Sequence, residues 1–280
     1  MGDKNIDNIG IRNLEKYLLP SGKNLSLKDY ASDDVSGFDG DKDAARGCLR
    51  LLCKKLSRLQ ELLYAEAKHK VLVVLQGMDT AGKDGTIKMV FRGVNPQGVT
   101  VQSFKTPTEE ESSHDYLWRI HRSVPGKGRI AIFNRSHYED VLITRVHSMV
   151  SKDECGERYS QINDFERMLS EEGTVILKFF LHIDKDEQKK RLQARLDDPR
   201  KQWKFSASDV AERKFWDDYV RAYEVMLGAT STDYAPWYVI PADKKWYRNL
   251  LVASIIVDKL KRLNMKYPKP APGLSAGRSK

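Results

Sequence analysis

The chain has 280 residues, of which 31% are charged and 40% hydrophobic, and its net charge is +9 at pH 7. No apolar run is long enough to span a membrane and no secretory signal pattern is present, so we expect a soluble, cytoplasmic protein. The positive charge excludes little by itself but favours a polyanionic partner, which includes nucleic acid, an anionic membrane surface and polymeric phosphate.

Residues 1–40 are polar and weakly periodic, and we expect an extended or loosely docked N-terminal arm. Leucines then recur at steps of three and four from Leu49 to Leu63, which predicts an amphipathic helix of about two dozen residues. The next segment, HKVLVVLQG at residues 69–77, is short, β-branched and bounded by glycine. This pattern is typical of a strand buried on both faces of a parallel sheet.

From this strand onward, expected strands and helices alternate. Further strands are expected at residues 99–104, 128–136, 174–184 and 236–242. Helices are expected at residues 83–94 and 108–120, from residue 136 onward, and at 157–171, 184–197, 206–227 and 243–264. The alternation predicts an α/β fold with a five-stranded, mostly parallel sheet flanked by helices, which forms one domain at residues 41–265. The Pro/Gly/Ser-rich residues 266–280 are expected to form a mobile basic tail.

The first strand leads into GMDTAGK, residues 77–83, which has the G-x-x-x-x-G-K spacing of a phosphate-binding loop. Its position between a strand and a helix suits this function, because backbone N–H groups and a helix N-terminus must converge on the anion. A plain glycine turn is the structural alternative. We expect Lys83 to neutralise the transferring phosphate. The predicted substrate-binding residues around it are Gly77, Met78, Ala81, Gly82, Gly85 and Thr86.

Two acids in this loop depart from the usual motif. Asp84 stands where Ser or Thr is expected, and Asp79 adds a second carboxylate. Carboxylates that face phosphate make sense if a metal ion bridges them, and Mg²⁺ takes such oxygen ligands, with Mn²⁺ as the second choice. The alternative for Asp84 is that acids are favoured in the first turn of a helix, which explains Asp79 less well.

The third strand ends in IAIFNRSHYED, residues 130–140. Arg135 is expected at the carboxyl end of this strand, where a bidentate contact would stabilise phosphoryl charge. Glu139 is a candidate catalytic residue and Asp140 a candidate metal ligand. Ser136 and Glu139 also have the spacing of a capping box, which would require no function of Glu139.

Residues 189–204, KKRLQARLDDPRKQWK, contain seven Lys or Arg and two Asp. They follow the fourth strand and its helix, where nucleoside-monophosphate-kinase-like proteins carry a lid. We therefore predict a helical lid at about residues 189–226, and the alternative is a solvated helix face. The cations expected to close over the phosphates are Arg191, Arg195, Lys201 and Lys204.

Five segments resemble, in order, the signature blocks of the family-2 polyphosphate kinases: GMDTAGKDGTI, FKTPTEEE, IFNRSHYEDVL, DDPRKQWKFSASD and IPADKKWYRNL. The resemblance covers about residues 45–264 and implies a nucleoside-monophosphate-kinase-like P-loop fold. In that family the loop holds inorganic polyphosphate, and a nucleotide meets it over Mg²⁺. The implied reaction is reversible transfer to AMP and ADP, giving ADP and ATP, because NRSHYED looks most like the subgroup that uses both acceptors.

The resemblance also implies roles for individual residues. Asp79, Lys83 and Asp84 match the acid, lysine and second acid of the family's loop. Arg135 matches the arginine after the third strand, and Glu139 and Asp140 match the acidic pair that follows. The remaining matches are the basic lid residues Arg195, Lys201 and Lys204, and Lys244, which is implied to lie near the phosphates. Related proteins commonly form dimers or tetramers, so a homo-oligomer is expected, with neither nucleic acid nor a membrane as partner.

Two other functions compete with this one. An ATP-dependent deoxynucleoside or thymidylate-type kinase would share the fold and an arginine after the third strand, but Asp84 replaces the hydroxyl that such a loop carries. A nucleic-acid-binding protein could use the basic stretch and tail, but this function leaves the loop and its acids unexplained.

Overall fold

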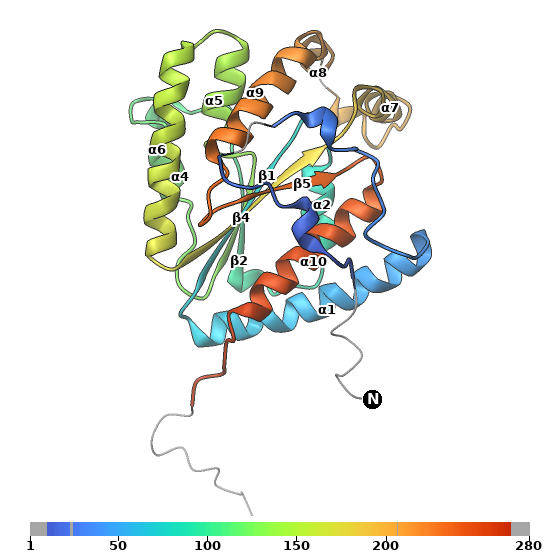
Figure 1. Cartoon of the computed structure of the whole chain (residues 1–280), viewed down its shortest axis with the longest axis vertical. Helices are drawn as coiled ribbons and strands as arrows, with labels where there is room; N and C mark the ends of the chain where they lie inside the picture. The colour runs from blue at the N-terminus through green and yellow to red at the C-terminus, as the bar shows by residue number, and fades with distance from the viewer. Residues whose placement is uncertain (1–9, 23–24, 206, 270–280) are drawn as a thin grey trace, which may run out of the picture.

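The computed structural model describes residues 10–22, 25–205 and 207–269, and its centre is a five-stranded sheet (Figure 1). The strands are β1 (Lys70–Gln76), β2 (Val99–Ser103), β3 (Ile130–Asn134), β4 (Thr174–His182) and β5 (Trp237–Pro241). Their order is β2-β3-β1-β4-β5, and every neighbouring pair is parallel. The predicted α/β fold and its five strands are confirmed.

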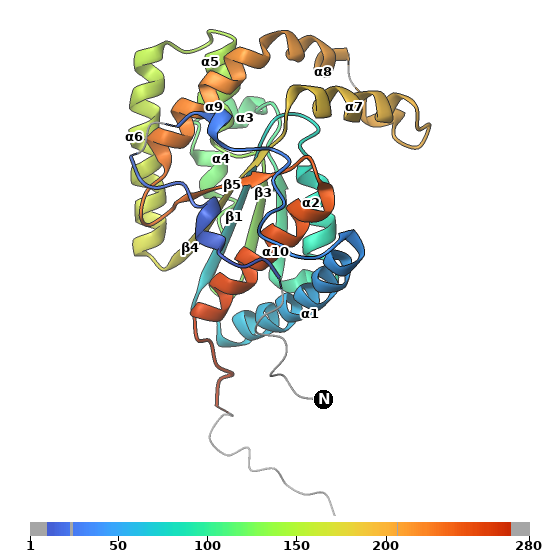
Figure 2. The same cartoon turned by 45° about the vertical axis from the view of Figure 1, so that its right-hand side comes forward.

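Helices cover both faces of the sheet (Figures 1 and 2). On one face lie α1 (Lys42–Glu66), α2 (Lys83–Val90) and α10 (Lys245–Arg262). On the other lie α5 (Glu139–Val146), α6 (Lys152–Glu171) and α9 (Trp216–Thr230). The remaining helices are α3 (Glu109–Ser112), α4 (Trp118–His121), α7 (Lys185–Leu196) and α8 (Ala207–Glu212). The 3-10 turns are η2 (Leu14–Tyr17), η3 (Leu27–Asp29), η4 (Pro96–Gly98), η5 (Gln202–Lys204) and η6 (Arg213–Phe215).

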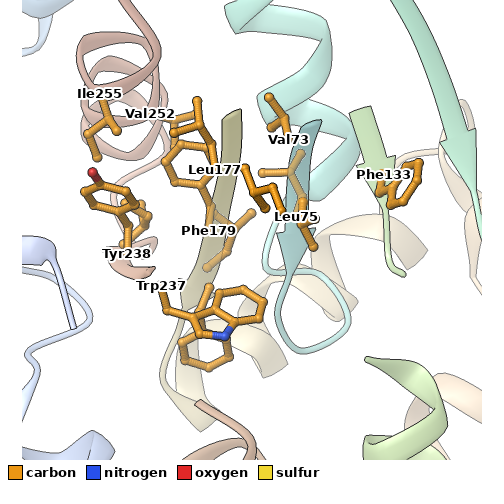
Figure 3. Close-up of a cluster of buried hydrophobic side chains, with 14 of the residues drawn as sticks. Val73, Leu75, Phe133, Leu177, Phe179, Trp237, Tyr238, Val252 and Ile255 are labelled. Atoms are coloured by element: carbon orange, nitrogen blue, oxygen red, sulfur yellow. The ribbon is translucent and has the colours of Figure 1, made fainter. Parts of the chain in front are cut away.

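The central strand β1 is apolar along its length because both of its faces are covered. Its residues 71–75 have 0% exposure, which explains why the sequence shows a continuous apolar run instead of alternation. Figure 3 shows Val73 and Leu75 near Leu177 and Phe179 of β4, with Val252 and Ile255 of α10 in the same cluster. The leucine stripe of α1 is buried as predicted. This packing fixes the carboxyl end of β1, from which the loop at residues 77–82 emerges.

The N-terminal arm packs more tightly than expected. Ile11, Tyr17, Leu19 and Leu27 are all buried. The backbone N–H of Leu19 donates to the carbonyl of Trp237 at 2.8 Å, so the arm lies against the β5 edge of the sheet. The sequence does not indicate this docking, because the buried side chains are spaced irregularly along a polar segment.

Two predicted helices are interrupted. The capping box at Thr108 is present, but residues 108–120 form two short helices, α3 and α4. The expected helix at 206–227 is divided into α8, η6 and α9, and residue 206 lies outside the described residues. Of the expected basic tail, residues 270–280 also lie outside them. Across the part of the chain that is described, no helix combines the length and apolarity that crossing a membrane requires.

Candidate active site

The loop at residues 77–82 has a backbone that only glycine accommodates at its two ends. Gly77 and Gly82 have φ angles of 148° and 106°, in the region that favours glycine. A Cβ atom on Gly77 would lie 2.6 Å from the carbonyl oxygen of Leu181, and one on Gly82 would lie 1.8 Å from an Arg248 nitrogen. Both motif glycines are therefore required by conformation and by close contacts beneath the loop.

Lys83 begins α2, and its side chain is buried along the loop. Its Nζ donates to the carbonyl of Gly77 at 2.7 Å and to that of Met78 at 3.4 Å. Burial, helped by the nearby charge of Arg135, lowers the pKa of Lys83 to about 8. The ammonium group therefore sits within the curve of the loop, with part of its hydration replaced by backbone carbonyls.

The end of β3 holds both unusual acids of the loop. Asn134 Nδ2 donates to Asp84 Oδ1 at 2.7 Å, and the Nη2 of Arg135 lies 2.6 Å from Asp79 Oδ1. Arg135 has a φ of 63°, a left-handed conformation that is uncommon outside glycine. Its Nη1 also lies 3.4 Å from Glu139 Oε2. The structure thus brings Asp79, Lys83, Asp84, Arg135 and Glu139 together, as the sequence predicted.

The capping-box alternative for Glu139 is wrong. Helix α5 begins at Glu139 and has no side-chain cap. The Ser136 hydroxyl accepts hydrogen bonds from Gln76 Nε2 at 3.1 Å and from the backbone N–H of Tyr138 at 3.3 Å instead. The Glu139 carboxylate is therefore available to Arg135. The alternative for Asp84 stays open, because Asp84 does lie in the first turn of α2.

Asp140 occupies a more enclosed position than the other acids. Its Oδ2 is buried without a hydrogen bond and lies 3.7 Å from Arg119 Nη2. Burial raises the pKa of this carboxyl. Among the described residues, no three His, Cys, Asp or Glu side chains gather into a ready-made metal site. Asp79, Asp84 and Asp140 suit a hard cation by donor type, but substrate oxygens would have to complete its coordination.

A cavity of about 260 Å³ adjoins the loop. Its lining includes Met78, Asp79, Arg135 and Glu139 and the aromatic residues Trp216, Tyr219 and Tyr223. These three aromatic residues were not predicted from the sequence, because their spacing of three and four is equally typical of the core-facing side of a helix. A cavity lined by both charged groups and aromatic rings suits a ligand with a charged group and a flat ring.

Arg191 lies beneath the loop instead of facing its open side. Its Nε binds Glu187 Oε1, its Nη1 binds the carbonyls of Thr80 and Ala81, and its Nη2 binds those of Ala242 and Asp243. An arginine has five N–H donors, and these contacts occupy all of them. This geometry favours a positioning role for Arg191 over the direct phosphate contact that we expected.

The other predicted cations are dispersed. Arg195 is half-buried on α7, and Lys201 is exposed and lies 2.6 Å from Asp198. Lys204 belongs to η5, and its side chain lies outside the described residues. Lys244 is the exposed N-cap residue of α10. Their closure over phosphate therefore stays a prediction.

No pattern in the sequence indicated a role for Arg248. This α10 residue is 2% exposed, and its Nη1 donates to the Ala81 carbonyl at 2.8 Å. A single arginine on an amphipathic helix usually extends to solvent, so its spacing gave no sign of burial. The only available signal was its position in the block IPADKKWYRNL.

The family model, the relatives and the solved structure that this chain resembles all have polyphosphate in their names. The family model described as Polyphosphate kinase 2 matches residues 39–268. A Meiothermus ruber protein named AMP/ADP-polyphosphate phosphotransferase is 57% identical over 257 residues, which cover 92% of this chain and 96% of the relative. A Rhodopseudomonas palustris protein named ADP-polyphosphate phosphotransferase is 48% identical over 270 residues, covering 92% and 93%. The crystal structure of polyphosphate kinase 2 from Arthrobacter aurescens superposes with a TM-score of 0.90 at 46% identity, covering 94% of each chain.

Proposed function

The chain belongs to the polyphosphate kinase 2 family, and on that premise we propose that it transfers phosphate reversibly between inorganic polyphosphate and both AMP and ADP. The relative with the higher identity, 57%, carries both nucleotides in its name, whereas the one at 48% carries ADP alone. The family match favours this reaction over an ATP-dependent deoxynucleoside or thymidylate-type kinase.

The observation that carries this proposal is the shared wall between the loop and the cavity. Gly77, Met78 and Asp79 belong to the loop and also line the cavity. Polyphosphate bound at the loop and a nucleotide bound in the cavity would therefore present their phosphates to each other. The rings of Tyr219 and Tyr223 suit the flat base of the nucleotide.

Lys83 and Arg135 supply the positive charge at the point of transfer. Phosphoryl transfer needs positioned cations around the oxygens of the moving group more than it needs covalent chemistry. Arg135 is oriented for this task by two carboxylates, Asp79 at 2.6 Å and Glu139 at 3.4 Å. We assign the basic residues Arg195, Lys201, Lys204 and Lys244 to the phosphate chain.

A divalent cation completes the proposed site. Asp79, Asp84 and Asp140 are the proposed ligands of Mg²⁺, with Mn²⁺ as a substitute, because they offer the hard carboxylate oxygens that these ions prefer. The ion would neutralise phosphate charge and orient the two substrates.

A homo-oligomer, a dimer or a tetramer, is the proposed assembly. Strand β2 is at the edge of the sheet, and Val101 on it is 51% exposed. Exposed sheet edges are commonly covered by another chain or element. Light scattering coupled to size-exclusion chromatography tests the assembly, and a monomer at micromolar concentration would contradict it.

The direct test of the reaction omits ATP. The protein is incubated with Mg²⁺, long-chain polyphosphate and either AMP or ADP, and nucleotides are separated by chromatography. We expect ADP and ATP to form. If polyphosphate yields no product while ATP phosphorylates a deoxynucleoside, the alternative kinase function is correct.

A further inference from the structure

Arg248 is a buried cation that lacks a negatively charged partner. Its Nε and Nη2 donate to the amide oxygen of Asn249 at 3.1 and 2.9 Å, and its Nη1 donates to the Ala81 carbonyl. Within the described residues, no carboxylate forms an ion pair with it. Arg191, buried on the other side of the same carbonyl, does have a carboxylate, that of Glu187 at 2.7 Å.

An uncompensated buried charge is unfavourable for folding. Burial, together with the charge of Arg191, lowers the pKa of Arg248 to about 9. The same two arginines act on the exposed Lys245, whose pKa is lowered by partial desolvation and by these charges. Cations are therefore crowded at the start of α10, and no acid lies in the first turn of that helix.

The position of the guanidinium group suggests what would balance its charge. An added Cβ on Gly82 would lie 1.8 Å from Nη1, and one on Gly85 would lie 3.3 Å from Nη2. The group is therefore packed directly against the end of the loop and the first turn of α2. Because C=O and N–H point in opposite directions across a trans peptide, holding the Ala81 carbonyl also turns the Gly82 N–H away from Arg248.

We propose that Arg248 lacks a carboxylate partner because the bound phosphate chain balances its charge, which makes Arg248 a positioning residue for polyphosphate. This inference rests on the proposed function, since it requires polyphosphate to occupy the loop. Arg248 does not touch the phosphate. It acts through the loop backbone and through its charge, which the free protein leaves unbalanced.

Asn249→Asp tests this inference because it supplies the missing negative charge and keeps the oxygen that Arg248 binds. The free protein is expected to melt at a higher temperature, because a buried cation gains a partner. Polyphosphate of defined length is expected to bind about tenfold more weakly, the order expected for one charge acting through protein. ADP affinity is expected to change little.

Asn95→Asp is the matched control. It makes the same chemical change in an exposed residue whose side-chain oxygen accepts from the backbone N–H of Gln97 at 3.0 Å, a contact that a carboxylate retains, and it should alter neither melting temperature nor polyphosphate affinity. A second pair of variants tests Arg248 itself. Arg248→Gln should weaken polyphosphate binding, and Arg248→Lys, which keeps the charge, should retain more of it.

Opposite changes in stability and affinity are the signature of the proposal. Unchanged polyphosphate affinity in Asn249→Asp would overturn it, and so would a lower melting temperature of the free variant. Failure of the wild-type protein to bind polyphosphate would instead refute the proposed function, and with it this inference.

Discussion

Asn134 Nδ2 donates a hydrogen bond to Asp84 Oδ1 at 2.7 Å, and the next residue, Arg135, binds Asp79. Two consecutive residues at the end of β3 therefore hold both acids of the loop. This arrangement keeps the carboxylates at fixed positions beside the loop, where the proposed divalent cation would need them.

Asp84→Asn should raise the Mg²⁺ concentration needed for half-maximal transfer by about tenfold, because a proposed metal ligand loses its charge. Titration of activity with Mg²⁺ measures this. Asp43→Asn is the control, since Asp43 is likewise an exposed acid in the first turn of a helix, α1, and is not a proposed metal ligand. If both variants leave the titration unchanged, Asp84 is only a favourable first-turn acid.

Lys83→Met should reduce transfer at least about a hundredfold, because it removes a cation expected at the moving phosphate. Met is similar in length to Lys, and the loss of two hydrogen bonds to loop carbonyls is offset by the removal of a buried charge, so the melting temperature should be nearly unchanged. Activity and thermal unfolding measured on the same preparation separate the two effects. Retained activity would show that Lys83 does not contact the phosphate.

The lowered pKa of Lys83, about 8, predicts a pH dependence. The protonated amine is the useful form, so kcat/KM for polyphosphate should fall as pH rises above about 8, and Lys83→Arg should remove this fall. The same pKa shift should affect folding stability in the opposite direction, raising it as pH rises. Between about 8 and 10.5 the unfolded chain binds more protons at this site, so stability should increase with pH there. A kcat/KM that stays flat to pH 10 would contradict the assignment.

Glu166→Gln should destabilise the protein by about 3–5 kcal/mol, because it leaves Lys178 as a buried charge without a partner. The two side chains have 0% exposure and lie 2.6 Å apart. Glu166 also accepts from the hydroxyl of Tyr138 at 2.7 Å, next to the start of α5. Urea unfolding measures the free energy.

The double variant Glu166→Leu with Lys178→Met is the control for this ion pair. Replacing both charges by apolar groups should be less harmful than Glu166→Gln alone. Equal or greater destabilisation of the double variant would mean that the pair itself contributes strongly to stability.

Gly82→Ala should destabilise the protein by more than about 1 kcal/mol and abolish transfer, because the new methyl group clashes with Arg248 at a positive φ. Gly156→Ala in α6 is the matched control, since nothing lies within 4 Å of its added Cβ. That substitution should be neutral or stabilising by up to about 1 kcal/mol. A stable, active Gly82→Ala variant would contradict the close packing beneath the loop.

Local patterns in the sequence determined the five strands, their parallel arrangement and the cluster around the loop. Lys83 lies in the loop motif itself, and Arg135 and Glu139 directly follow a buried strand. Parallel strands align their carboxyl ends, so residues that directly follow neighbouring strands lie close together. Their proximity can therefore be predicted from the sequence. The continuous apolar run of β1 and the leucine stripe of α1 likewise report burial directly.

Only the tertiary structure decided what lies beneath and beside the loop. Arg248 contacts Ala81 across 167 residues of sequence, and Arg191 does so across 110. Periodicity records whether a face is buried but not which distant carbonyl a buried cation meets. The same limit applies to Tyr219 and Tyr223, whose helical spacing fits core and cavity equally well. The positions that face the proposed substrates follow from how α7, α9 and α10 pack around β1, a long-range arrangement that no local pattern specifies.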